Sequence, residues 1–314
     1  GYLNCVTADM PREDKADLCP LSAGFTEDEL EIAGDALRTA PASIAVLDVE
    51  SGELLAALEA QATQDHQRTY ENYQEAYPLG STMNIFAALT AFSAGDSPST
   101  LLWDLESSYG TEAANDSDES YAGPLRLREA LAEDHLRPLT ARLGTYGSGA
   151  VQRFASLFGL TGSSSVPENE VLYKGSNNTA EAAAFSLIPF ATLGDQTGSD
   201  AGGTMHPVTI LRIETEENGN EFPQPFIRKS LIASNLAYLV HHVFSRNTEG
   251  IQLSDRPAAV KTGSVRGEDS LWVSGYSTQI SCALRLGDPQ NYSAFVEDTD
   301  RIRITAGILW QSIM

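Results

Sequence analysis

A serine at the start of an apolar stretch is the first residue in this chain whose type and position suggest covalent chemistry. Ser81 follows a Pro-Leu-Gly turn and precedes "TMNIFAALTAF", which has the apolar spacing of a helix. Side chains three residues apart share a helix face, so a basic side chain at position 84 could take the proton of the Ser81 hydroxyl. That residue is Asn84, and an amide cannot accept a proton near neutral pH. The sequence therefore contains a candidate nucleophile, Ser81, with no basic side chain at position 84 on the same helix face.

Net charge restricts the partners of this chain. The 314 residues carry a formal net charge of -23, from 43 acidic and 20 basic side chains. Such a field repels nucleic acid and anionic lipid, so we expect neither as a partner. No apolar run is long enough to span a membrane, and residues 1–20 lack the basic start and apolar core of a signal peptide. We therefore expect membrane attachment only through a segment outside this sequence.

The cysteines bear on redox and metal chemistry. Cys5 and Cys19 flank a short polar segment, and this spacing is compatible with a disulfide in an oxidising compartment or with two free thiols. Cys282 lies in an apolar, strand-like run and is expected to be a buried free thiol. No group of Cys and His residues has metal-ligand spacing, so we expect no metal.

The periodicity of the sequence predicts strands at both ends of the chain and helices between them. Alternation around Ser-Gly indicates a β-hairpin over 44–58, followed by a polar loop or insertion over 59–76. Helical spacing is found at 83–95, 125–144, 149–162, 178–198 (with a break near Pro189) and 228–247. Short strands are expected at 257–264, 270–277, 279–288 and 291–298, with a final helix at 304–314.

This order of elements predicts an α+β fold in which the two ends of the chain complete one antiparallel sheet. Residues 1–25 are expected to form an N-terminal segment or linker, and 26–314 a single domain. Within that domain, the sheet would come from about 40–58 and 257–314, and the helical part from about 82–250.

Segments spread along the chain carry a family resemblance. They are "VLDVESGELLA", "YPLGSTMNIFAAL", "YAGPLRLREALAE", "VKTGS" and "EDSLWVSGYS". In this order they resemble the transpeptidase domain of penicillin-binding proteins, the acyl-serine transferases that cross-link peptidoglycan. The resemblance implies a β-lactamase-like α+β fold, with a central antiparallel sheet and an all-helical subdomain.

The resemblance also assigns roles to the motifs S-x-x-K, S-x-N and K-T-G. Ser81 stands at the nucleophile position and Asn84 at that of the lysine base. Asp134 and Leu136 stand where the serine and asparagine of S-x-N are expected. In that family the K-T-G strand binds the terminal carboxylate of the substrate. The matching residues here are Lys261, Thr262, Gly263 and Ser264.

The loss of the lysine predicts that acylation of Ser81 is impaired. Removing a general base costs roughly 10²- to 10⁴-fold in rate, and Leu136 lacks the donor and acceptor of an asparagine. Two alternatives would retain activity. His135 can replace the lysine as base. Ser176 and Asn178 also match the S-x-N pattern, but they precede a helix that the resemblance places away from the site.

Structural roles can also explain the retained residues. Ser81 can serve only as the N-cap of the helix that follows it. The Lys-Thr-Gly strand can persist because a glycine is required where strand and helix pack closely, without any ligand. These explanations stand beside the catalytic and ligand-binding ones.

The resemblance implies a bacterial extracytoplasmic protein that uses no metal and no organic cofactor. It would lie in the periplasm or at the cell surface, anchored through an N-terminal segment outside this sequence. Its expected partners are cell-wall synthesis proteins or a peptidoglycan stem peptide, with a β-lactam as a further ligand. Two functions stay open. One is a pseudo-transpeptidase acting as scaffold, regulator or wall-peptide binder. The other is an active transpeptidase, carboxypeptidase or β-lactam acceptor that uses Ser81 with a non-standard base.

Overall fold

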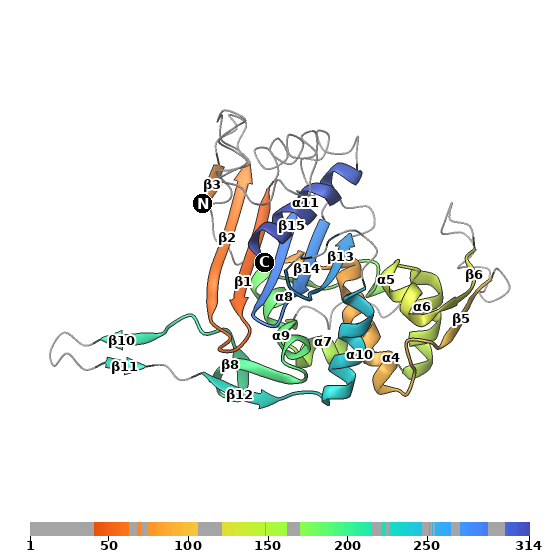
Figure 1. The fold of residues 1–314 in the computed structure, drawn as a ribbon, viewed down its shortest axis with the longest axis horizontal. Helices are drawn as coiled ribbons and strands as arrows, with labels where there is room; N and C mark the ends of the chain where they lie inside the picture. Colours follow the sequence, from red (N-terminus) through yellow and green to blue (C-terminus); the bar gives the residue numbers. More distant parts are fainter. Residues whose placement is uncertain are drawn as a thin grey trace.

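A central antiparallel sheet organises the molecule (Figure 1). The computed structural model describes residues 41–62, 68–70, 75–105, 121–147, 149–161, 170–214, 221–223, 226–246, 251, 253, 255–264, 271–287 and 299–314. The sheet has six strands in the order β13-β14-β15-β1-β2-β3. Their bounds are Ala259–Ser264 (β13), Leu271–Tyr276 (β14), Ile280–Leu286 (β15), Ala42–Asp48 (β1), Leu54–Ala62 (β2) and Arg68–Tyr70 (β3). Because β1 pairs with β15, both ends of the chain complete one sheet, as the sequence predicts.

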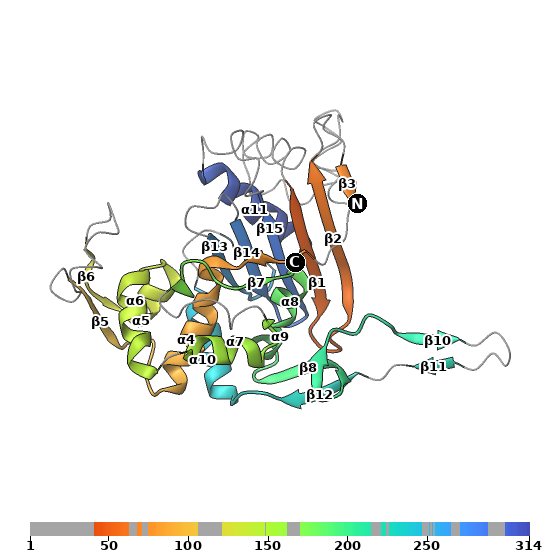
Figure 2. The same cartoon turned by 180° about the vertical axis from the view of Figure 1, so that it is seen from behind.

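Helices cover both faces of this sheet (Figures 1 and 2). Ala45 and Val46 are adjacent on β1 but belong to different apolar clusters, since successive strand residues point to opposite faces. The α11 helix (Thr299–Ile313) packs on the Val46 face through Trp310, beside the buried free thiol of Cys282. The helices on the other side are α4 (Asn84–Ser93), α5 (Leu127–Ala132), α6 (Leu136–Leu143), α7 (Ala150–Leu157), α8 (Ala180–Phe185), α9 (Ile188–Ala191) and α10 (Ser234–Phe244).

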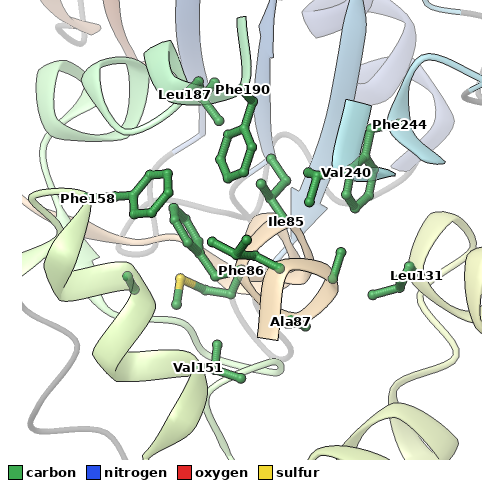
Figure 3. Close-up of a cluster of buried hydrophobic side chains, with 14 of the residues drawn as sticks. Ile85, Phe86, Ala87, Leu131, Val151, Phe158, Leu187, Phe190, Val240 and Phe244 are labelled. Atoms are coloured by element: carbon green, nitrogen blue, oxygen red, sulfur yellow. The ribbon is translucent and has the colours of Figure 1, made fainter. Parts of the chain in front are cut away.

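The α4 helix lies at the centre of the helical part (Figure 3). Its residues are buried on every side from Asn84 to Phe92, which suits a helix that is apolar all round. Phe86 meets Phe158 edge-on with ring centroids 5.4 Å apart, and Phe158 stacks on Phe190 at 5.1 Å. This core fixes the position of the helix that begins at Asn84, three residues after Ser81.

Smaller sheets extend the molecule. The β5–β6 ribbon and the β10–β11 ribbon lie at opposite ends of its long axis (Figure 1). Their bounds are Leu101–Asp104 (β5), Gly123–Arg126 (β6), Arg212–Glu214 (β10) and Glu221–Pro223 (β11). The remaining strands are β4 (Tyr77–Pro78), paired with β7 (Asn177–Asn178), and β8 (Asp195–Ala201), which lies between β9 (Thr204–His206) and β12 (Ile227–Ser230).

Several predicted elements differ from the observed ones. The segment 125–144 is not one helix, because α5 ends at Ala132 and α6 begins at Leu136. The polar segment 59–76 is not only a loop, since β2 continues to Ala62 and pairs with β3. The helices expected over 178–198 and 228–247 are shorter, because β8 and β12 form at their ends.

Other expectations concern residues outside the described ranges. These are the strand at 291–298, the pairing of Cys5 with Cys19, and the N-terminal segment 1–25. Within the described ranges, no helix combines the length and apolar character needed to cross a membrane. The same residues contain no cluster of His, Cys, Asp and Glu suited to a metal ion.

Candidate functional site

Backbone contacts fix the turn that carries Ser81. This residue lies in a 3-10 turn, η2 (Gly80–Met83), and is 3% exposed. The turn is held where the indole nitrogen of Trp272 donates to the carbonyl of Pro78 at 2.8 Å, and where the Gly80 amide donates to the carbonyl of Lys174 at 3.0 Å. Ser81 does not cap α4, because the cap position is Met83. The serine side chain therefore has another role.

Asp134 occupies the break between α5 and α6 in an unusual backbone conformation. Its φ of 58° lies in the left-handed region, which aspartate tolerates better than most residues. Backbone hydrogen bonds fix this corner, since the amide of His135 donates to the carbonyl of Ala130 at 3.0 Å and the amide of Leu136 to that of Asp134 at 2.7 Å. The corner directs the Asp134 carboxylate toward Ser81.

The Asp134 carboxylate is the centre of the site. Its Oδ2 accepts a hydrogen bond from the Ser81 hydroxyl at 3.0 Å and from the Lys261 ammonium at 2.8 Å. Its Oδ1 accepts from the amide nitrogen of Asn84 at 2.5 Å. A cation and several donors stabilise the ionised form of a carboxylate. The residues at the nucleophile and lysine positions, Ser81 and Asn84, thus converge with Lys261 on the carboxylate of Asp134, which stands at the S-x-N serine position.

Asn84 is completely buried one turn along from Ser81. Its amide nitrogen also lies 3.4 Å from the carbonyl of Leu131, at the end of α5. Its Oδ1 atom has no hydrogen-bond partner among the described residues. Both contacts of the nitrogen are to oxygen acceptors, so the orientation of this amide is well determined. Asn84 therefore holds Asp134 in place and presents an unpaired acceptor beside it.

The Lys-Thr-Gly-Ser strand lies against the serine turn. A Cβ atom at Gly263 would meet the backbone nitrogen of Thr82 at 2.4 Å, so close packing alone requires a glycine there. Lys261 is 1% exposed and also donates to the carbonyl of Thr262 at 2.5 Å. Thr262 is buried as well, whereas Ser264 is exposed. Of the residues proposed to bind ligand, Ser264 thus offers the most exposed side chain.

The other predicted residues lie around this cluster. The imidazole of His135 lies 3.4 Å from the carboxylate of Glu133, whereas the Ser81 hydroxyl donates to Asp134. Leu136 begins α6 and packs against the apolar core.

The second S-x-N match lies closer to Ser81 than expected. Through the pairing of β7 with β4, its segment runs beside the residues that precede the serine turn. Asn178 is buried and donates to Ser176 Oγ at 2.8 Å, so these two side chains bond to each other.

A partly buried polar cluster lies beside β4, the strand that precedes the same turn. Tyr77, in β4, has the guanidinium of Arg285 3.5 Å above its ring. Its hydroxyl lies 2.7 Å from both Glu59 and Glu75. Burial raises the pKa of Glu59, with the neighbouring Glu75 contributing, and burial with both carboxyl contacts raises the pKa of Tyr77. No local sequence pattern indicates this cluster, because Glu59, Tyr77 and Arg285 are distant from one another in the chain.

Comparison with known proteins supports the fold. No protein-family model and no curated protein sequence matches the chain. Solved structures match at a probability of 1.00. The penicillin-binding protein PonA1 from Mycobacterium tuberculosis has a TM-score of 0.67 and 16% identity, over 91% of this chain and 81% of that one. Penicillin-binding protein A from the same organism, solved as an imipenem acyl-enzyme complex, has a TM-score of 0.65 and 13% identity, over 92% and 79%.

A third match covers both chains almost completely. The transpeptidase domain of penicillin-binding protein 3 from Burkholderia pseudomallei has a TM-score of 0.63 and 16% identity, over 91% of each chain. These matches agree with the α+β arrangement described above, in which one antiparallel sheet faces a helical part. The chain therefore has the fold of the transpeptidase domains of penicillin-binding proteins.

Proposed function

We propose that this chain is an extracytoplasmic domain associated with peptidoglycan synthesis, in which acylation of Ser81 is impaired. It serves as a scaffold or regulator of cell-wall synthesis proteins, or as a binder of wall peptides. The fold supports the association with the cell wall, since the matching structures are penicillin-binding proteins. Attachment to the membrane through a segment outside this sequence belongs to the same proposal.

One observation carries the proposed impairment. The Ser81 hydroxyl donates to a carboxylate oxygen that also accepts from the Lys261 ammonium. An ionised carboxylate held by a cation and by the amide of Asn84 is a weak base, because protonation would break these interactions. A serine without an effective base is a poor nucleophile. We therefore expect acylation slower by roughly 10²- to 10⁴-fold than in a site with a lysine base.

Intact-mass spectrometry after incubation with a penicillin tests this proposal. The native protein is expected to show no adduct on the timescale at which active acyl-serine sites are fully labelled. Ser81→Ala is the negative control, and a penicillin-binding protein of known activity is the positive one. Rapid, stoichiometric labelling that maps to Ser81 would reject the impairment.

A second function is favoured by the same geometry. Asp134 Oδ2 lies 3.0 Å from the Ser81 hydroxyl, within reach for proton transfer to a carboxylate base. In that case the chain is a slow acyl-serine enzyme or β-lactam acceptor. Slow labelling of native protein that is lost in Asp134→Asn but kept in His135→Ala would support it. Labelling lost only in His135→Ala would instead identify the histidine as base.

A further inference from the structure

The β12 strand (Ile227–Ser230) is an open edge of its sheet. The strand order is β12-β8-β9, so β12 pairs with β8 on one side and with no described strand on the other. In Figures 1 and 2 it runs along the lower border of the molecule, beyond β8. All four of its residues are exposed. An edge strand of this kind offers unpaired backbone donors and acceptors to another extended chain.

Large apolar side chains lie where β12 meets the β10–β11 ribbon. Phe226 and Ile227, at the start of β12, are 51% and 36% exposed. Ile210 and Leu211, directly before β10, are 54% and 55% exposed. Because β10 and β11 pair antiparallel, the segment before β10 and the segment after β11 leave the same end of the ribbon. Exposed apolar residues that gather in this way typically mark an interaction surface.

The strand itself is basic in an otherwise acidic chain. Arg228 and Lys229 are exposed, and neither has an ion-pair partner among the described residues. Their cross-strand neighbours on β8 are Thr197 and Gln196, which are neutral. Since the chain has 43 acidic residues and only 20 basic ones, two adjacent cations without a counter-charge reverse the sign of the charge locally. This edge therefore attracts an acidic partner.

Neither carboxylate of β8 lies directly opposite the two cations. Asp195 is in register with Ser230, and Asp200 lies beyond the stretch that pairs with β12. Successive strand residues point to opposite faces, so Arg228 and Lys229 present one cation on each face of the sheet. An added strand with two adjacent acidic residues would place one carboxylate beside each cation.

Basic residues on an edge strand also protect it against pairing between identical chains. Two-fold pairing of β12 with a second copy, centred on Arg228 or on Lys229, would place that cation directly opposite its own counterpart. Such repulsion disfavours a second copy, but it does not disfavour a segment of opposite charge. Protection alone also leaves the exposed Phe226 and Ile227 at the same edge unexplained.

We propose that β12 binds an extended acidic segment of a partner protein, which adds to the three-stranded sheet as a further strand. The backbone of that segment pairs with the open edge, two adjacent acidic residues pair with Arg228 and Lys229, and an apolar residue packs on Phe226. The inference rests on the scaffold function proposed above, because it assigns the surface and the chemistry through which a partner binds. It does not depend on the chemistry of Ser81.

Capped peptides of matched sequence test this proposal. The acidic peptide has a central Glu-Glu pair flanked by valine, isoleucine and threonine, and the basic peptide has Lys-Lys in its place. A third peptide is the acidic one with N-methyl groups on both glutamates, which removes a backbone donor from each of its edges. Each is titrated into the full, isotopically labelled chain, and binding is measured by NMR at the backbone amides of 226–230.

The acidic peptide is expected to give its largest amide shifts at 226–230. At these amides it should bind at least about tenfold more tightly than the basic peptide, and the preference should weaken with added salt. The N-methylated peptide has the same charge but cannot complete the backbone pairing, so its binding should be lost. This comparison separates strand addition from charge attraction alone.

Variants assign the effect to the two cations. Arg228→Glu and Lys229→Glu should each weaken binding of the acidic peptide by about fivefold. Arg246→Glu, which reverses an exposed charge just after α10, is the matched control and should leave binding unchanged. The double variant Arg228→Glu/Lys229→Glu should instead prefer the basic peptide at 226–230. All three positions are exposed, so the variants are expected to fold as the native chain does.

Four results would overturn the inference. They are no amide shifts at 226–230, equal binding of the acidic and basic peptides there, equal binding of the N-methylated peptide, and a native dimer in sedimentation that Phe226→Ser converts to monomer. The last result would identify a second copy as the occupant.

Penicillin labelling of Ser81 is measured separately from these titrations. Absence of both a penicillin adduct and peptide binding would reject the acidic-strand site and leave the impaired acylation intact. Rapid labelling together with peptide binding at 226–230 would reject the impaired acylation and leave the binding site intact.

Discussion

Ser81 and Lys261, far apart in the sequence, donate hydrogen bonds to the same oxygen atom of Asp134, at 3.0 and 2.8 Å. This shared acceptor bears on the impaired acylation proposed for Ser81. Asn84 stands at the position where the resemblance to transpeptidases implies a lysine base. In addition, the Asp134 carboxylate pairs with Lys261 and holds the serine hydroxyl.

Restoring the lysine alone should not restore acylation. In Asn84→Lys the new ammonium would lie beside Asp134, which Asn84 now contacts at 2.5 Å, and an ion pair would keep it protonated. Asn84→Lys with Asp134→Ser removes that obstacle, and adding Leu136→Asn completes the motif. We expect penicillin labelling, measured by intact mass, in the multiple variants only. Full labelling of Asn84→Lys by itself would show that Asp134 is no obstacle.

Removing the charge of Asp134 should destabilise the protein. Asp134→Asn leaves the Lys261 ammonium buried without its counter-charge, which typically costs about 3 kcal/mol. Asparagine tolerates the left-handed backbone, so the loss reflects charge rather than strain. Urea denaturation measures the effect. The double variant Asp134→Asn/Lys261→Met should regain most of the lost stability, and equal losses in the single and double variants would contradict the ion-pair argument.

Gly263→Ala should displace the turn that carries Ser81. The added methyl group would lie 2.4 Å from the backbone nitrogen of Thr82, so strand or turn must shift, and overpacking of this kind costs about 1 to 3 kcal/mol. Gly144→Ala is the control, because an added Cβ there meets nothing within 4 Å. Thermal unfolding of the two variants should differ by several degrees.

The cluster formed by Glu59, Glu75, Tyr77 and Arg285 should make the free energy of unfolding depend on pH. The Tyr77 hydroxyl has one proton but lies 2.7 Å from two carboxyl groups, so keeping both hydrogen bonds requires one carboxyl to be protonated. Burial raises the pKa of Glu59, so the folded protein binds this proton more tightly than the unfolded chain. The associated stability is therefore present below the ordinary pKa of a glutamate and is lost as pH rises through the folded value.

Glu59→Gln tests this dependence, because glutamine imitates the protonated carboxyl. The variant should match the native protein near pH 4 and exceed its stability near pH 8, in urea denaturation at both values. Glu53→Gln, a half-buried residue at the start of the same hairpin strand, serves as control. Parallel pH profiles of the native protein and Glu59→Gln would exclude the protonated cluster.

The sequence predicts the architecture well because local periodicity reflects burial. The strand β1 and the helix after Ser81 consist mostly of apolar residues, and both are largely buried. The prediction failed at residues 133–135, where helical spacing continues across a corner. That corner is stabilised by contacts of Asp134 with Ser81, Asn84 and Lys261, which no local pattern contains.

The candidate site was likewise predictable from the sequence only in part. The motif positions predicted that Ser81, Asn84, Asp134 and Lys261 are site residues. Their mutual contacts required the structure, since the role of an aspartate depends on which donors surround it. The polar cluster of Glu59, Tyr77 and Arg285 could not be predicted from the sequence for the same reason, because its members come from three different strands.

The pairing of β1 with β15 has a consequence for the order of folding. Residues 42–48 find their sheet partner only at 280–286, so the hairpin of β1 and β2 must wait for almost the whole chain before its inner edge is paired. Contacts of such high sequence separation slow folding, because loop closure precedes the stabilisation that it allows. The Lys261 strand belongs to this sheet, and the Ser81 turn packs against that strand. A chain that ended before β13 would contain Ser81 and Asp134 without the cation that pairs with the Asp134 carboxylate.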